Sequence, residues 1–217
     1  MASTWLYLAR HGEVEQAREG RLFGHADVPL SPVGRQQAEA LARRLAEEPI
    51  EAVYASDLVR AQASATPLAG VRGLVPVLLP ALREIALGGF EGLTLAEMEA
   101  REPGTTRRWL ADPAAVAYPG GESLRELRAR VLAALEALLA RHAGRRFAVV
   151  AHGGPNRVIL AEALGVALGE VLTIGQAFGA WSLIEYRPEG PVVHALNREA
   201  AVAGPPPLEP ATHRRDD

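Results

Sequence analysis

The sequence predicts a three-layer α/β fold, with a mostly parallel central sheet and helices on both of its faces. Strand-like apolar runs alternate with helix-like segments along the 217 residues, a pattern typical of parallel sheets. Two of these runs end alike: residues 4–8 precede Arg10-His11-Gly12, and residues 147–151 precede His152-Gly153. Because ligands bind at the carboxyl ends of strands in such sheets, we expect the two histidines to face each other there.

Strands are expected where short runs of β-branched, aromatic and other apolar residues stand between turn signals. These runs are residues 4–8, 51–55, 75–79, 147–151, 181–186 and 192–196. The segment between the first two runs begins with residues 12–30, which are polar and irregular. A connection of this length is typical of a functional loop, so we expect it to lie over the site.

Helices are expected between the strands, and capping residues mark most of their starts. Ser31 and Pro32 open a helix that extends to residue 48, and Ser56 caps a helix that carries Arg60 in its first turns. Capping boxes then open a short helix at residue 94 and a long helix at residue 123 that ends at residue 144. A second short helix covers residues 105–110, and a last one runs from 155 to about 165.

Length and composition favour one domain. We assign residues 1–199 to a catalytic domain and residues 200–217, rich in alanine, proline and charge, to a flexible tail. The chain has no cysteine, which excludes disulfides, thiol nucleophiles and cysteine-ligated metals. All 23 basic residues are arginine, so lysine chemistry is excluded too. A net charge of −3 gives no reason to expect nucleic-acid binding, and no apolar run is long enough for a membrane span or an export signal. We therefore expect a cytoplasmic protein.

Four side chains, Arg10, His11, Arg60 and His152, are expected around one point at the sheet edge. Two guanidinium groups suit a phosphate, because each can donate two parallel hydrogen bonds to its oxygens. A metal bound by the two histidines and a carboxylate is disfavoured, because the arginines would repel it. The same arginines favour a neutral imidazole, which is a competent nucleophile at phosphorus.

The alkoxide that leaves the phosphorus needs a proton, and a carboxyl group can supply it. Glu84 follows the third expected strand and is flanked by Ile85 and Ala86, whose burial would favour the protonated form. Glu13 is the competing candidate, and the residues alone leave both open.

These motifs resemble the histidine phosphatase superfamily, in its branch related to cofactor-dependent phosphoglycerate mutase. The resemblance covers most of residues 4–197 through blocks that keep their order. The blocks are residues 10–13, 20–25, 30–34, 56–61, 84, 88–94, 119–123 and 152–153. It implies a phosphoglycerate mutase-like fold, a phosphohistidine on His11 and Glu84 as proton donor. It also implies no metal or cofactor, and a phosphate pocket of Arg10, Arg60 and His152 with Gly153.

Departures from the family pattern favour hydrolysis over mutase activity. Similar proteins carry a hydroxyl and an amide where this chain has Val14 and Ala17, and mutases carry a basic segment where residues 85–91 have no base. Residues 153–160 and 176–179 are similar to those of α-ribazole phosphatases, which suggests α-ribazole 5′-phosphate as substrate. The roles of Arg157, His25 and Gln176 stay open.

Three hypotheses follow. The first is a metal-independent phosphomonoesterase that acts on a small phosphorylated metabolite through His11. The second is a phosphoglycerate mutase, and the third is a non-catalytic domain that binds a phospho-ligand. The third is disfavoured because the chain keeps both His11 and Glu84. The expected partner is a small-molecule phosphate ester, with neither nucleic acid nor membrane, and a homodimer stays open.

Overall fold

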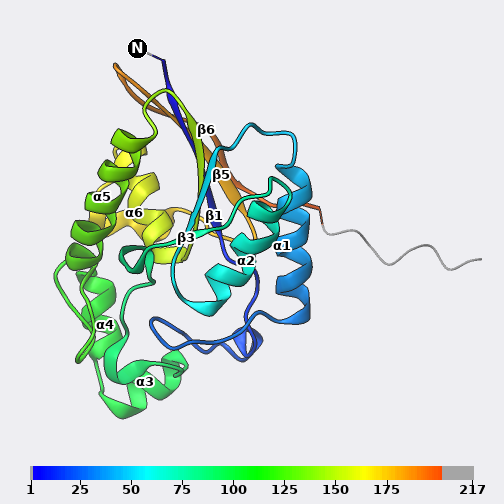
Figure 1. Ribbon diagram of the computed structural model, residues 1–217. Coiled ribbons are helices and arrows are strands. Elements are labelled where there is room, and N and C mark those ends of the chain that lie inside the picture. Colours follow the sequence, from blue (N-terminus) through cyan, green and yellow to red (C-terminus); the bar gives the residue numbers. More distant parts are fainter. Residues whose placement is uncertain (1, 202–217) are drawn as a thin grey trace, which may run out of the picture.

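The computed structural model describes residues 2–201, so the part of the expected tail from residue 202 onward lies outside the described residues. Within this range six strands form one sheet in the order β3-β2-β4-β1-β5-β6 (Figure 1). The strands are β1 Thr4–Arg10, β2 Ala52–Ala55, β3 Val77–Leu78, β4 Arg146–Ala151, β5 Trp181–Arg187 and β6 Gly190–Arg198. The pairs β1·β4, β4·β2 and β2·β3 are parallel, whereas β5 and β6 are added antiparallel on the β1 side.

Helices fill the connections between the strands. The α-helices are α1 Pro32–Arg44, α2 Val59–Gly70, α3 Leu95–Arg101, α4 Thr105–Ala111, α5 Leu124–Arg141 and α6 Gly153–Leu164. Single 3-10 turns are η1 Ala17–Glu19, η2 Pro80–Leu82, η3 Gly88–Phe90 and the longer η4 Leu168–Thr173. Among the described residues, no helix is both long enough and apolar enough to span a bilayer.

Alternate residues of β1 face opposite layers. Leu6 and Leu8 pack in one core with the apolar faces of α5 and α6, whereas Tyr7 and Ala9 pack in a second core with α1 and α2. Figure 1 shows these two helix pairs on opposite sides of the sheet. The predicted three-layer, mostly parallel α/β architecture is therefore confirmed.

The two strands that precede the histidines are hydrogen-bonded neighbours. In the β1·β4 pairing Arg10 lies opposite Ala151, and the backbone N–H of His11 donates to Ala151 O at 3.0 Å. The strand ends are therefore in register, and His11 and His152 leave the sheet side by side.

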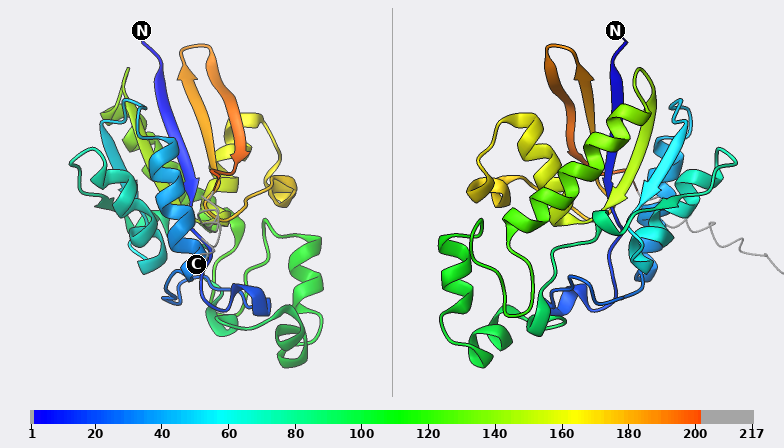
Figure 2. Two further views of the ribbon diagram at one scale, coloured as in Figure 1. Left: turned by 90° about the vertical axis from the view of Figure 1, so that its right-hand side faces the viewer. Right: turned by 60° about the vertical axis from the view of Figure 1, so that its left-hand side comes forward.

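Helices α3 and α4 lie beyond the carboxyl ends of the strands and form a small lid (Figure 2). We use "lid" for residues 95–111. It is anchored on a core of its own, made by Leu87, Phe90, Met98 and Tyr118, with Trp109 packed against it. The capping box predicted at Thr94 and Glu97 is present at the start of α3.

Several expected boundaries are wrong. Helix α1 ends at Arg44 rather than at residue 48, α6 starts at Gly153 rather than at residue 155, and η4 has no counterpart in the expected elements. Strand β1 continues through Arg10, so this side chain belongs to the strand end rather than to the loop. The third strand shrinks to Val77–Leu78, because it is an exposed edge with only β2 as a neighbour.

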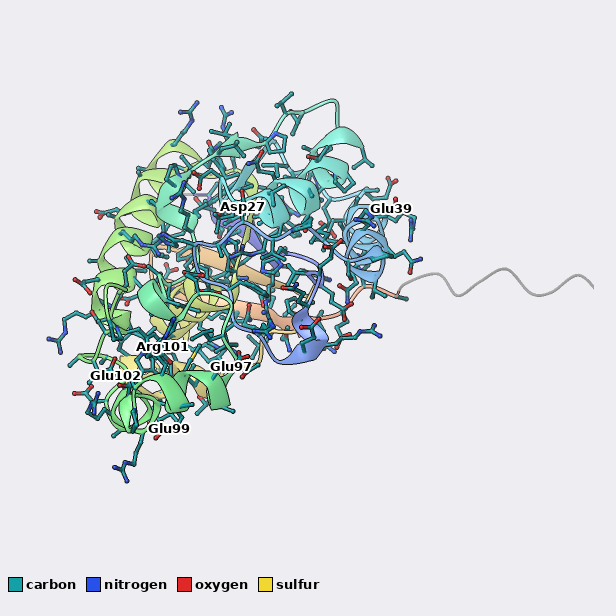
Figure 3. The ribbon with its side chains drawn as sticks, turned by 90° about the horizontal axis from the view of Figure 1, so that it is seen from below. Asp27, Glu39, Glu97, Glu99, Arg101 and Glu102 are labelled. Atoms are coloured by element: carbon teal, nitrogen blue, oxygen red, sulfur yellow. The ribbon has the colours of Figure 1, made fainter. Side chains whose placement is uncertain are left out.

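The expected N-cap of α2 is also wrong. Leu58, not Ser56, occupies the N-cap position, and the Ser56 hydroxyl accepts from Leu58 N at 3.3 Å. The acceptor for the first helical N–H comes from the distant loop: Asp27 Oδ1 lies 2.7 Å from Val59 N (Figure 3). Helix α2, which carries Arg60, is thus tied at its start to the loop that precedes α1.

Candidate active site

His11 leaves the end of β1 with its ring buried and its tautomer determined by one contact. Its Nδ1 lies 2.7 Å from the carbonyl oxygen of Gly12. A carbonyl oxygen only accepts, so Nδ1 carries the proton and donates. The other ring nitrogen, Nε2, therefore keeps its lone pair, which is the form that a nucleophilic imidazole requires.

His152 has the opposite tautomer. It is the N-cap residue of α6 and is fully buried, and its Nδ1 accepts from Arg60 Nε at 3.2 Å. A neutral ring that accepts at Nδ1 carries its proton on Nε2. Within the described residues this Nε2–H has no hydrogen-bond partner. The two imidazole rings lie 4.9 Å apart between centroids at 61°, so the expected pairing of the histidines is present.

Both rings are held in the neutral state. Burial lowers the pKa of His11 well below its usual value, and the charges of Arg10 and Arg60 lower it further. Burial likewise lowers the pKa of His152, with smaller contributions from His11 and the arginines. Neutral rings preserve the lone pair on one histidine and a donor on the other.

Arg60 is held by backbone carbonyls of the loop over the site. Its guanidinium donates to Ala26 O at 2.7 Å and to Gly24 O at 2.6 Å, while Nε binds His152. The side chain is only 1% exposed, and burial lowers its pKa, a shift that the charge of Glu84 opposes. The loop thus positions a buried cation beside both histidines.

Arg10 approaches from the other side of His11. Its guanidinium donates to Gln176 O at 2.5 Å and stacks 3.9 Å from the ring centroid of Phe178. Burial lowers its pKa to about 10, which leaves it charged at neutral pH. Phe178 also lies 5.6 Å from His11, so one aromatic ring packs against both residues. Gln176 contacts Arg10 through its backbone, and its half-buried side chain donates to Gly175 O at 2.8 Å.

Glu84 reaches the same point from the segment after β3. Its carboxylate accepts from Gly154 N at 3.0 Å and from Ile85 N at 2.8 Å. A Cβ on Gly154 would stand 2.2 Å from Glu84 Oε1, so only glycine allows this approach. Glu13, the competing candidate, accepts from the Ser31 hydroxyl at 2.8 Å and holds the start of α1 instead.

Glu91, Arg130 and Glu122 position the site without having been expected there, and His25, whose role stayed open, joins them. The Glu91 carboxylate accepts from the backbone N–H groups of residues 24, 25, 26 and 87, which joins the loop under Arg60 to the segment after Glu84. Arg130 donates to Glu84 O at 2.8 Å and pairs with Glu122 at 2.8 Å. His25 Nε2 also lies 3.0 Å from Glu84 O.

Sequence patterns gave little signal for these positioning roles. Arg130 stands on a long helix among other charged residues, where an arginine is usually solvated. Glu91 and Glu122 lie within the glycine-rich blocks that carry the family resemblance, and this placement was the available hint. Arg157, whose role stayed open, binds Ile174 O at 2.9 Å and lines the site next to Gly153.

The site opens into a cavity of about 440 Å³. Five of the six predicted site residues line it, namely Arg10, His11, Arg60, Glu84 and Gly153, whereas His152 is fully buried beside His11 and Arg60. Residues of the loop from Val14 to Phe23 line its wall, as expected for a loop over the site. In residues 2–201, no three side chains of the His, Cys, Asp or Glu type are grouped as a metal site requires.

Comparison with known proteins places the chain in a family. Residues 6–199 match the model of the histidine phosphatase superfamily, branch 1. The chain is 33% identical over 192 residues to phosphoserine phosphatase 1 of Hydrogenobacter thermophilus, which covers 88% of this chain and 91% of that one. It is 33% identical over 161 residues to a probable phosphoglycerate mutase of Yersinia pestis, covering 74% and 75% of the two chains.

Solved structures agree with this assignment. The α-ribazole phosphatase of Shigella flexneri superposes with a TM-score of 0.84 at 25% identity, covering 93% of this chain and all of that one. The chain therefore belongs to the histidine phosphatase superfamily, and the prediction of a phosphatase of this superfamily is confirmed.

Proposed function

We propose that this member of the superfamily is a metal-independent phosphomonoesterase that hydrolyses a small phosphate ester through a phosphohistidine on His11. One observation carries the proposal: the ring of His11 holds its proton on Nδ1 against Gly12 O, which leaves the Nε2 lone pair beside two buried guanidinium groups. Arg10, Arg60, the Nε2–H of His152 and the backbone at Gly153 are the donors that we assign to the phosphoryl oxygens.

In the first step, the Nε2 lone pair of His11 forms a bond to phosphorus and the ester P–O bond breaks. The electron pair of that bond leaves on the alcohol oxygen, which takes a proton from the carboxyl group of Glu84. The buried guanidinium groups stabilise the negative charge that spreads over the equatorial oxygens of the phosphoryl group. The alcohol departs and the phosphoryl group stays on His11.

In the second step, water attacks the phosphorus and gives its proton to the Glu84 carboxylate. The N–P bond breaks, its electron pair returns to His11 Nε2, and inorganic phosphate leaves. Each residue then has its starting protonation state, so the cycle needs no cofactor. The backbone donors of Gly154 and Ile85 hold the Glu84 carboxyl in place for both proton transfers.

For the substrate, we propose α-ribazole 5′-phosphate as the first ester to test. The Shigella flexneri α-ribazole phosphatase shares the fold over nearly the whole chain, which supports this choice. A phosphoglycerate mutase is the second candidate, because one relative carries that name. Residues 85–91 hold no base, and Ile85 and Leu87 line the cavity, which favours hydrolysis.

The test combines turnover with trapping of the intermediate. With excess chelator present, the wild type should hydrolyse 4-nitrophenyl phosphate and carry acid-labile phosphate after rapid quenching, and His11→Ala should lose both. His194→Ala is the control, because His194 lies on β6 and is paired with Glu185. Unchanged hydrolysis in His11→Ala would overturn the proposal. Conversion of one phosphoglycerate isomer into the other in a coupled assay would favour the mutase instead.

A further inference from the structure

The cavity beyond the phosphate end is walled by apolar side chains. Arg10, Glu84 and Arg157 gather around Gly153, and Arg60 lies beside His152. Apart from Arg21 and Thr106, the rest of the wall is largely aliphatic and aromatic. Trp109 and Tyr118 stack there at 5.4 Å and 13°, as part of the lid and its core. The cavity therefore joins a cationic end to an apolar chamber.

Four leucines at the cavity keep large exposed surfaces. Leu22 is 38% exposed, Leu95 52%, Leu110 59% and Leu172 44%, and all four line the cavity. They come from separate segments: the loop before α1, the two lid helices and η4. Apolar surface that converges around a cavity is typical of a ligand-binding site, because a bound apolar group removes it from water.

Besides Arg10, Arg60, Glu84 and Arg157, one charged side chain lines the cavity among the described residues, and it is already paired. Arg21 donates to Glu97 at 3.0 Å, to Glu19 at 3.2 Å and to Gly92 O at 2.7 Å. A carboxylate or ammonium group on the substrate would thus lose its hydration without gaining an unpaired opposite charge, which is unfavourable.

The lid carries both carboxylates and leucines. Figure 3 shows Glu99 and Glu102 on the lid at the border of the molecule, away from the sheet. Leu95 and Leu110, on the same two helices, line the cavity. Both leucines also line a second, more open hollow together with Glu99, so they lie at the rim of the cavity.

We propose that the alcohol part of the substrate is apolar and uncharged, and that Leu110 of the lid and Leu172 of η4 help to select it. This inference rests on the proposed function, because it names the alcohol released by the same reaction. It predicts that esters of bulky apolar alcohols are better substrates than phosphoserine or phosphoglycerate, whose carboxylates would enter the apolar chamber.

A series of straight-chain alkyl phosphates from ethyl to hexyl tests the proposal. Their alcohols leave with similar intrinsic reactivity, so a trend in kcat/KM reports binding of the chain. We expect kcat/KM to rise about two- to fourfold per methylene, as burial of each methylene predicts. A carboxylate at the far end of the hexyl chain should lower kcat/KM about tenfold or more.

Two variants and a matched control locate the effect. Leu110→Ser on α4 and Leu172→Ser on η4 should each reduce the gain in kcat/KM per methylene. Leu164→Ser should keep it, because Leu164 is 44% exposed at the end of α6 and does not line the cavity. Circular dichroism and thermal unfolding confirm that each variant is folded.

The outcomes separate this inference from the proposed function. The proposal of an apolar chamber would be overturned if kcat/KM did not change with chain length, or if the carboxylate ester were the better substrate. It would also be overturned if Leu164→Ser reduced the gain per methylene as much as the two cavity variants do. If His11→Ala still abolished hydrolysis of every ester in that case, the phosphohistidine proposal would stand and only the apolar chamber would fall. Hydrolysis that survives His11→Ala would instead contradict the proposed function, whatever the chain-length trend.

Discussion

Arg60 Nε donates to His152 Nδ1 at 3.2 Å, although the two residues lie 92 positions apart. This hydrogen bond from the Arg60 guanidinium determines the tautomer of His152, because an imidazole that accepts at Nδ1 carries its proton on Nε2. A lysine at position 60 would keep the charge but could not bind His152, Ala26 O and Gly24 O together in the same geometry.

Arg60→Lys should therefore lower kcat by roughly 10²–10³, the range seen when one preorganised donor is removed from an active site. Steady-state kinetics with 4-nitrophenyl phosphate measures the loss. Arg145→Lys is the matched control, because its guanidinium is 62% exposed and makes a surface pair with Glu51. Equal kinetics in Arg60→Lys and the wild type would contradict the proposed role of Arg60.

Gly154→Ala should displace the carboxyl of Glu84, because the new Cβ would stand 2.2 Å from Oε1. The expected loss is roughly 10²-fold in kcat for an alkyl phosphate, since general acid help is worth about 10²–10⁴-fold. The loss should be smaller for 4-nitrophenyl phosphate, whose leaving group needs no proton. Gly169→Ala, where a Cβ meets nothing within 4 Å, is the control. A uniform loss on both esters would argue against Glu84 as proton donor.

Glu91→Gln should loosen the loop that holds Arg60. The carboxylate of Glu91 accepts from four backbone N–H groups, and an amide offers one accepting oxygen in place of two. We expect the free energy of unfolding to fall by about 1–3 kcal/mol, the cost of leaving buried donors without partners. Urea unfolding measures it. Glu39→Gln is the control, because Glu39 is exposed on α1 (Figure 3) and makes only a long ion pair, of 3.9 Å, with Arg43 one helical turn away.

Stability should decrease as the pH falls through the usual histidine range. Burial and nearby arginines lower the pKa of His11 and His152 in the folded state. Below about pH 6.5 the unfolded chain therefore binds protons that the folded chain does not, and the free energy of unfolding falls. Each histidine should contribute about 1 kcal/mol of loss between pH 7 and pH 5.5.

Urea unfolding at both pH values, in buffers free of phosphate, checks this pH dependence. The double variant His11→Gln/His152→Gln should show a smaller loss than the wild type, since glutamine does not titrate. An identical loss in the two proteins would mean that other groups cause the decrease. No such dependence on these histidines is expected above pH 7, where they are neutral in both states.

The strand and helix pattern was readable from the sequence because periodicity and caps are local. The capping boxes at Thr94 and Ser123 are present as predicted, and strands β1 and β4 end in Arg10-His11 and His152 as the apolar runs indicated. In α/β sheets the carboxyl ends of neighbouring parallel strands lie at the same edge. Fold class and the meeting of the histidines therefore followed from the chain itself.

Tertiary structure alone decided the contacts between distant segments. The cap of α2 comes from Asp27 rather than Ser56, and the tautomers of His11 and His152 depend on Gly12 O and Arg60. The family resemblance had implied Glu84 rather than Glu13 as proton donor, and the contact of Glu84 with Gly154 supports that proposal. Each of these contacts depends on where a loop or a second element lies in space, and no local spacing in the sequence encodes that distance.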